Sequence, residues 1–449
     1  MSAKVTVIMP SLNVSKYIEA CMESVLAQTL QDMEILVIDA GSTDGTLEIL
    51  EGFARKDGRI KVVHSDKKSY GYQMNLGISI ATGDYVGVVE TDDLIEPDMF
   101  ETLYTIAVSS QADYVKGMAE SFLWVAPEVE VRQPITVFDT NEFDSDGKIE
   151  IIPKEMPEIV SRDYFLWTGL YKRNFLEEIR FNETPGAAYQ DIGFLLQVYA
   201  KAKKAAYVDK LVYHYRKDNL NASGYNHSMF HYLAEEYRYV DRLLEGMGSE
   251  WYSVCFRKLF WQTNNRILTM AALGSFWEDV VPDIQILSSR LSEAVKNRFI
   301  IEEDLSPNAW NNLNKMIEDP IALYLEYAEQ FVQKRKNILY LRESLQKGQT
   351  VLVGSGKMGK FTHALLVYYG VETIKAYCDN GMGSQGKILQ GLPIMSPADA
   401  LNQYPDARFA ITSNKNAQEM EAQLLALGVG KDKIFKYTAG VDILLFAGK

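Results

Sequence analysis

The chain has 449 residues, of which 47% are hydrophobic and 24% charged, and its net charge at pH 7 is −14. This composition is typical of a soluble globular protein of about three domains, and it excludes collagen-like, low-complexity and disordered chains. The excess of negative charge argues against a nucleic-acid partner, because the chain repels a polyphosphate at long range.

The three cysteines, Cys21, Cys255 and Cys378, are far apart and have no metal-ligand spacing. They are therefore predicted to be reduced thiols in a cytosolic protein. No apolar run approaches the ~20 residues of a membrane helix, and the N-terminus lacks the apolar core of a signal peptide. We expect a cytoplasmic protein without a transmembrane segment, able at most to touch the inner face of the membrane.

The first hundred residues alternate between two hydrophobic periods. Short β-branched runs predict strands, and the segments between them have helical spacing. The predicted strands are 4–9, 34–38, 60–63 and 85–89, and the predicted helices are 15–28, 46–54 and 72–81. Strands that alternate with helices indicate βαβ units and a mostly parallel sheet.

Polar, turn-forming segments follow each predicted strand: 10–13, 39–42, 64–68 and 90–93. In open α/β sheets the ligand crevice lies beyond the carboxyl ends of the strands. These four loops are therefore expected to build the functional site.

Three carboxylates, Glu90, Asp92 and Asp93, fall within four residues at the end of the fourth strand. Like charges so close together repel, and a bound cation would relieve the repulsion. Mg²⁺ or Mn²⁺ held by one or two carboxylates and by diphosphate oxygens is one explanation. The alternative is that Asp93 caps a helix starting near Pro97.

Residues 5 to about 223 resemble the GT-A catalytic domain of glycosyltransferase family 2. The resemblance rests on Val-Thr-Val-Ile-Met-Pro-Ser-Leu-Asn at 5–13, on Ile-Asp-Ala-Gly-Ser-Thr-Asp-Gly-Thr at 38–46, and on Ala-Thr-Gly-Asp-Tyr at 81–85 with Glu-Thr-Asp-Asp at 90–93. Together, in this order and spacing, the motifs are specific, although each alone is weak.

The resemblance implies a nucleotide-sugar donor held with Mn²⁺ or Mg²⁺. Asp92 and Asp93 would hold the ribose and the metal, the two roles being undivided. The other residues expected to contact the nucleotide are Pro10, Ser11, Asn13, Asp39 and Lys68. A solvated surface lysine is the alternative for Lys68.

The chain departs from the family pattern at Leu12, Ala40 and Glu90. The usual residues are an aromatic before Asn13, an Asp that contacts the uracil ring, and the first Asp of the Asp-x-Asp signature. Asp39 is then the remaining residue for base recognition, and a donor other than a UDP-sugar becomes harder to exclude.

A later segment, 180–191, resembles the stretch that ends in the family's catalytic carboxylate. The usual Glu-Asp pair is Gln190-Asp191 here, which leaves Asp191 as the single base for an inverting displacement. The alternative is that Asp191 only caps the helix that follows. The segment 212–216 with 221–223 resembles the family's closing-loop motif, in which Arg216 would bind the donor diphosphate.

Residues 226–345 carry few breakers and are predicted to be helical. Residues 350–379 then show a strand, a glycine turn, a helix, a strand and an acid, which is the dinucleotide fingerprint in its proper context. Gly354, Gly356 and Gly359 would let a diphosphate approach the helix N-terminus, and Asp379 would accept from a ribose hydroxyl. The alternative is a Rossmann-like fold that keeps the turn for packing and binds nothing.

The sequence thus predicts an α/β protein in three parts: a GT-A domain with a Rossmann-like mixed sheet (1–225), a helical linking or acceptor region (226–345) and a C-terminal Rossmann-like accessory domain (346–449). The expected activity is inverting, metal-dependent hexosyl or N-acetylhexosaminyl transfer from a nucleotide sugar, with UDP as the expected nucleotide. The expected acceptor is a glycan or a polyol-phosphate polymer, and the chain could form an oligomer. The alternatives are an NAD-dependent sugar-nucleotide oxidoreductase and a non-catalytic sugar-nucleotide-binding scaffold.

Overall fold

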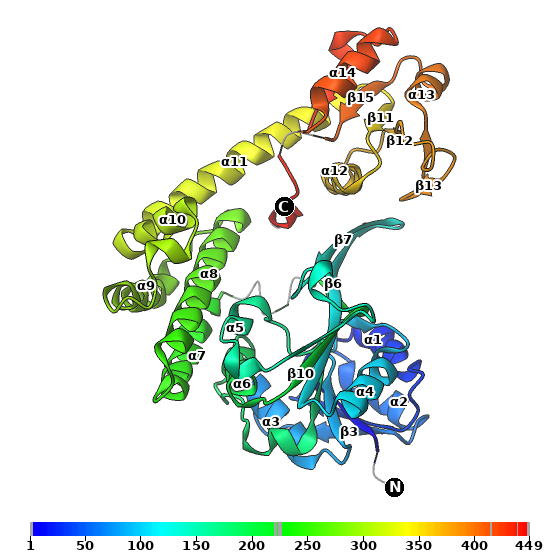
Figure 1. Cartoon of the computed structure of the whole chain (residues 1–449). Coiled ribbons are helices and arrows are strands. Elements are labelled where there is room, and N and C mark those ends of the chain that lie inside the picture. Colours follow the sequence, from blue (N-terminus) through cyan, green and yellow to red (C-terminus); the bar gives the residue numbers. More distant parts are fainter. Residues whose placement is uncertain (1–2, 220–221, 223–226, 414, 438, 447–449) are drawn as a thin grey trace. The chain divides into compact units, whose positions relative to one another are not determined.

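The computed structural model describes residues 3–219, 222, 227–413, 415–437 and 439–446 (Figure 1). The chain divides into two compact units. Unit 1 comprises Met1–Ser121, Gln133–Arg266 and Trp277–Pro320, and unit 2 comprises Phe122–Arg132, Ile267–Phe276 and Ile321–Lys449. The division into domains 1–225, 226–345 and 346–449 stays a prediction.

The main sheet has ten strands, in the order β3-β2-β1-β4-β9-β6-β10-β5, with β7 paired to β6 and β8 paired to β10. Its strands are β1 (Val5–Ser11), β2 (Met33–Asp39), β3 (Ile60–His64), β4 (Tyr85–Val88), β5 (Leu94–Ile95), β6 (Tyr114–Ala126), β7 (Val129–Ile135), β8 (Lys148–Ile151), β9 (Gly169–Lys172) and β10 (Ala205–Arg216). The first four strands pair in parallel, whereas β9 joins β4 and β6 in the antiparallel sense. The sheet is therefore mixed, as predicted.

The helices around this sheet are α1 (Ile18–Leu26), α2 (Thr46–Ala54), α3 (Tyr70–Ile80), α4 (Met99–Ser110), α5 (Ile159–Arg162) and α6 (Gln190–Lys201). Strands β1 and β2 are buried along their whole length, which explains why their sequences are continuous apolar runs. The predicted strands and helices of residues 4–89 are confirmed to within about three residues at each end.

A helical region follows β10, with α7 (Met229–Leu244), α8 (Ser249–Leu273), α9 (Val281–Lys296) and α10 (Pro307–Glu318). Helix α11 (Pro320–Leu345) then runs as one long, unbroken helix (Figure 1). None of the helices in the described part of the chain is long and apolar enough to cross a membrane.

Unit 2 holds a second sheet of six strands in the order β13-β14-β12-β11-β15-β16. The elements are β11 (Thr350–Val353), α12 (Lys357–Tyr368), β12 (Ile374–Cys378), β13 (Ile388–Leu389), β14 (Leu392–Met395), α13 (Pro397–Gln403), β15 (Arg408–Ile411), α14 (Ala417–Ala426) and β16 (Ile434–Lys436). Five of these strands are parallel, and β13 alone is antiparallel to its neighbour. The predicted C-terminal α/β fold is confirmed.

Candidate active site

The loops after β1 and β2 are tied together at the carboxyl edge of the sheet. Asn13 has a φ of +54°. Its N–H donates to Ser42 Oγ at 2.9 Å, and its side-chain oxygen accepts from Thr43 N–H at 2.8 Å. Asn13 therefore fixes the shape of the crevice, and its contact with a nucleotide stays a prediction.

Asp39 ends β2 and is fully buried. Its carboxylate accepts from the backbone N–H groups of Gly41 and Ser42, each at 2.9 Å, and from Ser42 Oγ at 2.5 Å. In this geometry the Asp39 carboxylate stabilises the turn of residues 39–42. Its predicted role in base recognition would require the carboxylate to accept a further donor.

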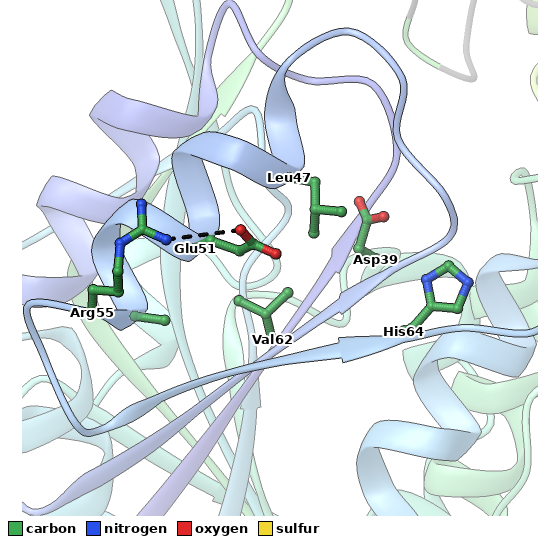
Figure 2. Close-up of a pocket in the computed structure, with 7 residues that line it drawn as sticks. Asp39, Leu47, Glu51, Arg55, Val62 and His64 are labelled. Carbon is green, nitrogen blue, oxygen red and sulfur yellow. Dashed lines mark ion pairs between the residues drawn. The ribbon is translucent and has the colours of Figure 1, made fainter.

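A pocket of about 480 Å³ lies beside Asp39, between α2 and the edge strand β3. Figure 2 shows Leu47, Glu51 and Arg55 on the α2 side and Val62 and His64 on the β3 side. Glu51 and Arg55 form an ion pair at 3.8 Å. This pocket is lined by none of the carboxylates of the 90–93 loop, so we do not assign it the chemistry of the site.

Pro10 and Ser11 lie at the end of β1, next to the acidic loop (residues 90–93). The carbonyl of Pro10 accepts from Thr91 Oγ1 at 2.9 Å, which fixes the 90–93 loop against β1. Ser11 is 1% exposed, and its Oγ has no hydrogen-bond partner among the described residues. A buried polar atom without a partner is costly, and the predicted contact of Ser11 with a nucleotide stays a prediction.

Glu90 interacts electrostatically with two other acids of the site, Asp92 and Asp191. Its Oε1 accepts from the Tyr70 hydroxyl at 2.7 Å. Burial raises the pKa of Glu90 to about 8, with the charges of Asp92 and Asp191 acting in the same direction. The electrostatic interaction between Glu90, Asp92 and Asp191 indicates that the structure brings these three carboxylates into one neighbourhood.

Asp92 and Asp93, which the sequence could not distinguish, have different environments. Asp93 is 0% exposed; its oxygens accept from Arg216 N–H at 2.7 Å and from the Tyr213 hydroxyl at 2.8 Å. Burial raises the pKa of Asp93 well above its usual range. The alternative that Asp93 caps the next helix is wrong, because α4 begins at Met99.

Asp92 is half-buried, and one of its oxygens, Oδ2, accepts from Asn219 Nδ2 at 2.7 Å. Its other carboxylate oxygen accepts no hydrogen bond from the described residues. A carboxylate oxygen of this kind, together with diphosphate oxygens, is the donor set that Mg²⁺ or Mn²⁺ prefers. Asp92, and not Asp93, is thus placed to take a further ligand.

Within the described ranges, no three His, Cys, Asp or Glu side chains are grouped so that they could hold a metal ion by themselves. A divalent ion at Asp92 would therefore need oxygen ligands from the substrate. Nothing in this donor set conflicts with the predicted Mn²⁺ or Mg²⁺, which stays a prediction.

Arg216 is the last residue of β10, and its side chain is hydrogen-bonded to the acidic loop. Its Nε donates to the carbonyl of Asp92 at 2.6 Å, and its guanidinium lies over the ring of Tyr17, 4.9 Å from the centroid. Its predicted contact with a diphosphate stays a prediction. Asn221 and Ser223, which belong to the same predicted motif, lie outside the described residues.

Two further cations near this loop were missed by the sequence reasoning. Lys217 lies over the ring of Tyr215 at 4.1 Å, and burial lowers its pKa to about 8, with the charge of Arg266 acting in the same direction. Arg266 comes from α8, 49 positions after Lys217, and lies over the ring of Tyr189, 5.4 Å from the centroid. No local sequence pattern connects these residues, because the fold alone brings α8 to the end of β10.

Asp191 lies in the first turn of α6, as predicted, but Tyr189 with a φ of +69° is the N-cap residue. No side-chain donor in the described part of the chain hydrogen-bonds the Asp191 carboxylate. Burial raises the pKa of Asp191, whereas the charges of Lys258 and Lys116 and the backbone N–H groups at the helix start act to lower it. The carboxylate is thus hydrogen-bonded to backbone N–H groups at the start of α6, and both hypotheses for Asp191, the catalytic base and a residue that only stabilises the helix start, stay predictions.

Gln190 stands where the family's Glu-Asp pair has its glutamate, and its hydrogen bonds show why an amide is found there. It is 1% exposed; its Nε2 donates to Thr184 and to the carbonyl of Gly186, and its Oε1 accepts from Ala188 N–H at 2.9 Å. A glutamate could not donate in this way when ionised. Gln190 therefore organises the loop that precedes Asp191.

Lys68 connects this loop with the loop after β3 through its backbone. Its carbonyl accepts from Gly186 N–H at 2.8 Å, and Tyr70 N–H donates to Gly186 O at 2.9 Å. The Lys68 side chain is exposed and makes no ion pair with the described residues. Because Tyr70 also bonds Glu90, the chain of contacts from Gly186 to Glu90 links the loop before Asp191 to the acidic loop.

In unit 2 the predicted dinucleotide fingerprint forms a tight turn. Gly354 has a φ of +106°, and a Cβ on Gly359 would lie 2.0 Å from Gly354 O, so both positions require glycine; Gly356 precedes α12 as its N-cap residue. Asp379 accepts from Ser355 N–H at 2.8 Å and from Gly381 N–H at 2.9 Å. Both carboxylate oxygens are thus used within the turn, and nucleotide binding here stays a prediction.

Comparisons with known proteins agree with this geometry. The family model of Glycosyl transferase family 2 matches residues 6–159. The chain is 30% identical over 249 residues to the uncharacterized glycosyltransferase EpsJ of Bacillus subtilis, covering 52% of this chain and 67% of EpsJ. It is 28% identical over 236 residues to the glycosyltransferase GlyG of Streptococcus pneumoniae, covering 48% of this chain and 72% of GlyG.

Among solved structures, S. aureus TarS 1–349 in complex with UDP-GlcNAc has a TM-score of 0.52 and 20% identity, covering 74% of this chain and 92% of that chain. This likeness concerns the fold. A mixed sheet with polar loops at its carboxyl edge and the likeness to TarS are those of the GT-A fold. The chain belongs to glycosyltransferase family 2, and the protein is a glycosyltransferase, as predicted.

Proposed function

We propose that the protein is an inverting, metal-dependent glycosyltransferase that moves a sugar from a UDP-sugar to a hydroxyl of a glycan or polyol-phosphate polymer. Family membership supports sugar transfer from an activated donor. The likeness in fold to TarS, whose structure was solved with UDP-GlcNAc, supports a uridine nucleotide. The partly exposed carboxylate of Asp92 supports a divalent cation on the diphosphate.

The observation that carries the proposal is the environment of Asp191. Its carboxylate lies beside the acidic loop, receives no side-chain hydrogen bond from the described residues and has a raised pKa because it is buried. An aspartate at the carboxyl edge of a sheet that receives no side-chain hydrogen bond, and whose pKa is raised, is suited to accept a proton. Structural carboxylates of the same sheet, Asp39 and Asp93, have all their oxygens engaged instead.

In the proposed reaction the acceptor oxygen attacks the anomeric carbon and the bond from that carbon to the diphosphate oxygen breaks. Asp191 takes the proton of the acceptor hydroxyl. The electron pair of the broken bond leaves on the diphosphate, whose charge Arg216 and Lys217 would offset. A divalent ion at Asp92, when bound, would supply further positive charge for the leaving group.

Donor hydrolysis tests this function directly. The full chain is incubated with a panel of UDP-, GDP- and ADP-sugars, with Mn²⁺ or with a chelator, and nucleoside diphosphate release is measured. We expect release from a UDP-sugar only when the metal is present. Release that is unaffected by the chelator would contradict metal dependence, and release from another nucleotide sugar alone would contradict the uridine assignment.

A further inference from the structure

Helix α11 has two opposite apolar faces. One face is buried and comprises Leu323, Tyr324, Tyr327, Phe331, Ile338, Leu341 and Leu345. The other face carries Leu325, Val332, Leu339 and Tyr340, whose exposed fractions are 59%, 49%, 40% and 68%. A helix that served only to pack on its own unit would show polar residues on this second face.

The exposed apolar residues form a stripe along one side of the helix. At about 100° per residue, Leu325, Val332 and Leu339 lie within roughly 40° of one another, because seven residues nearly complete two turns. Tyr340 lies on the same side of the helix, and the stripe from Leu325 to Tyr340 is about 22 Å long. The seven-residue spacing keeps these residues on one side of the helix, where they can lie along a second helix.

Two charges of opposite sign lie within the stripe. Glu329 and Lys336 are both exposed, and neither forms an ion pair with the described residues of its own chain. Lys334, two residues before Lys336, is by contrast already paired with Asp442 at 2.7 Å. Glu329 and Lys336 are one heptad apart and are equally distant from a midpoint between Val332 and Gln333.

We propose that the exposed stripe of α11 binds the same stripe of a second copy of this chain, with the two helices antiparallel. A two-fold axis at the midpoint between Val332 and Gln333 places Glu329 of one copy opposite Lys336 of the other, twice. The same axis places Leu325 opposite Tyr340 and brings the two Val332 side chains together. The surface is therefore complementary to itself in both charge and hydrophobicity, as a two-fold interface must be.

The balance of charge favours a second copy over a lipid surface. A membrane-binding helix face carries an excess of Lys and Arg beside its apolar residues, because lipid headgroups are anionic. In the stripe of α11 the negative charge of Glu329 and the positive charge of Lys336 cancel. Their order along the helix places opposite charges together in an antiparallel pair of copies. A parallel copy would place like charges at the same level of the two helices.

The test is the oligomeric state of the full chain, measured by analytical ultracentrifugation over a concentration series. We expect a dimer for the wild type and at least about tenfold weaker dimerisation for E329K and for K336E, because each variant places like charges together twice. The double variant E329K/K336E restores both pairs with their signs exchanged, so it should dimerise like the wild type. L325S should also weaken the dimer.

Far-ultraviolet circular dichroism and thermal unfolding of each variant check that the fold is unchanged, which is expected for exposed positions. A wild type that stays monomeric at high concentration would overturn the proposal. So would single variants that dimerise normally, or a double variant that fails to recover. Sedimentation with anionic phospholipid vesicles that is lost in L325S would assign the stripe to a membrane instead.

Discussion

The neighbouring carboxylates Asp92 and Asp93 should respond in opposite ways to replacement by alanine. Asp93→Ala leaves two buried donors, the Tyr213 hydroxyl and Arg216 N–H, without the acceptors that they meet at 2.8 and 2.7 Å. Each donor left unsatisfied costs about 1–3 kcal/mol, so the free energy of unfolding should fall by roughly 2–6 kcal/mol. Asp92→Ala removes a half-buried side chain with one partner, Asn219, and should cost at most about 1.5 kcal/mol.

Thermal unfolding and metal-dependent donor hydrolysis of both variants form the assay. The Tm of Asp93→Ala should fall by at least about 4 °C, given roughly 2 °C per kcal/mol for a large unit. The Tm of Asp92→Ala should fall by at most about 3 °C, and this variant should lose the response of hydrolysis to Mn²⁺. The reasoning is refuted if Asp93→Ala is as stable as the wild type while losing the Mn²⁺ response, since Asp93 would then be the exposed ligand and not a buried acceptor.

Two further predictions concern buried lysines. Lys258 is 2% exposed, and its charge lowers the pKa of Asp191; in Lys258→Met the pKa of Asp191 should rise. A general base acts when deprotonated, so the acidic limb of the pH–rate profile should move to higher pH, and an unmoved limb would exclude the interaction. Lys116 and Asp163 form an ion pair at 2.7 Å with both side chains 0% exposed. Asp163→Ala should lower the free energy of unfolding by about 3–5 kcal/mol in urea titrations; a double replacement by apolar residues should recover much of this loss, whereas equal losses would show that the pair's charges do not matter.

Most of the sheet that carries the site could be predicted from the sequence, because buried parallel strands are short, continuous apolar runs bounded by turns. Helix α2 begins and ends at the predicted residues, 46 and 54. The position of Asp191 in the first turn of α6 also followed from local sequence. Local patterns succeed where a residue's role depends on its neighbours in the chain.

The environments of the acids could not be predicted in this way. The carboxylates of Asp92 and Asp93 differ because β10, more than a hundred residues later, brings the Tyr213 hydroxyl and the Arg216 N–H to the carboxylate of Asp93 and not to that of Asp92. Lys258 reaches Asp191 from α8 for the same reason. Gln190 looked like a lost catalytic carboxylate, and only the fold of the 184–188 loop explains why an amide stands there.

The central claim, that Asp191 is the base, is tested most directly by Asp191→Asn. The amide keeps the size of the side chain but does not take up the proton, so sugar transfer should fall by roughly 10²–10⁴-fold. Calorimetric titration with the UDP-sugar and Mn²⁺ should give nearly the wild-type donor affinity, whereas the matched variant Asp92→Asn should lose affinity. A folded Asp191→Asn that binds donor normally and transfers sugar at the wild-type rate would contradict the account.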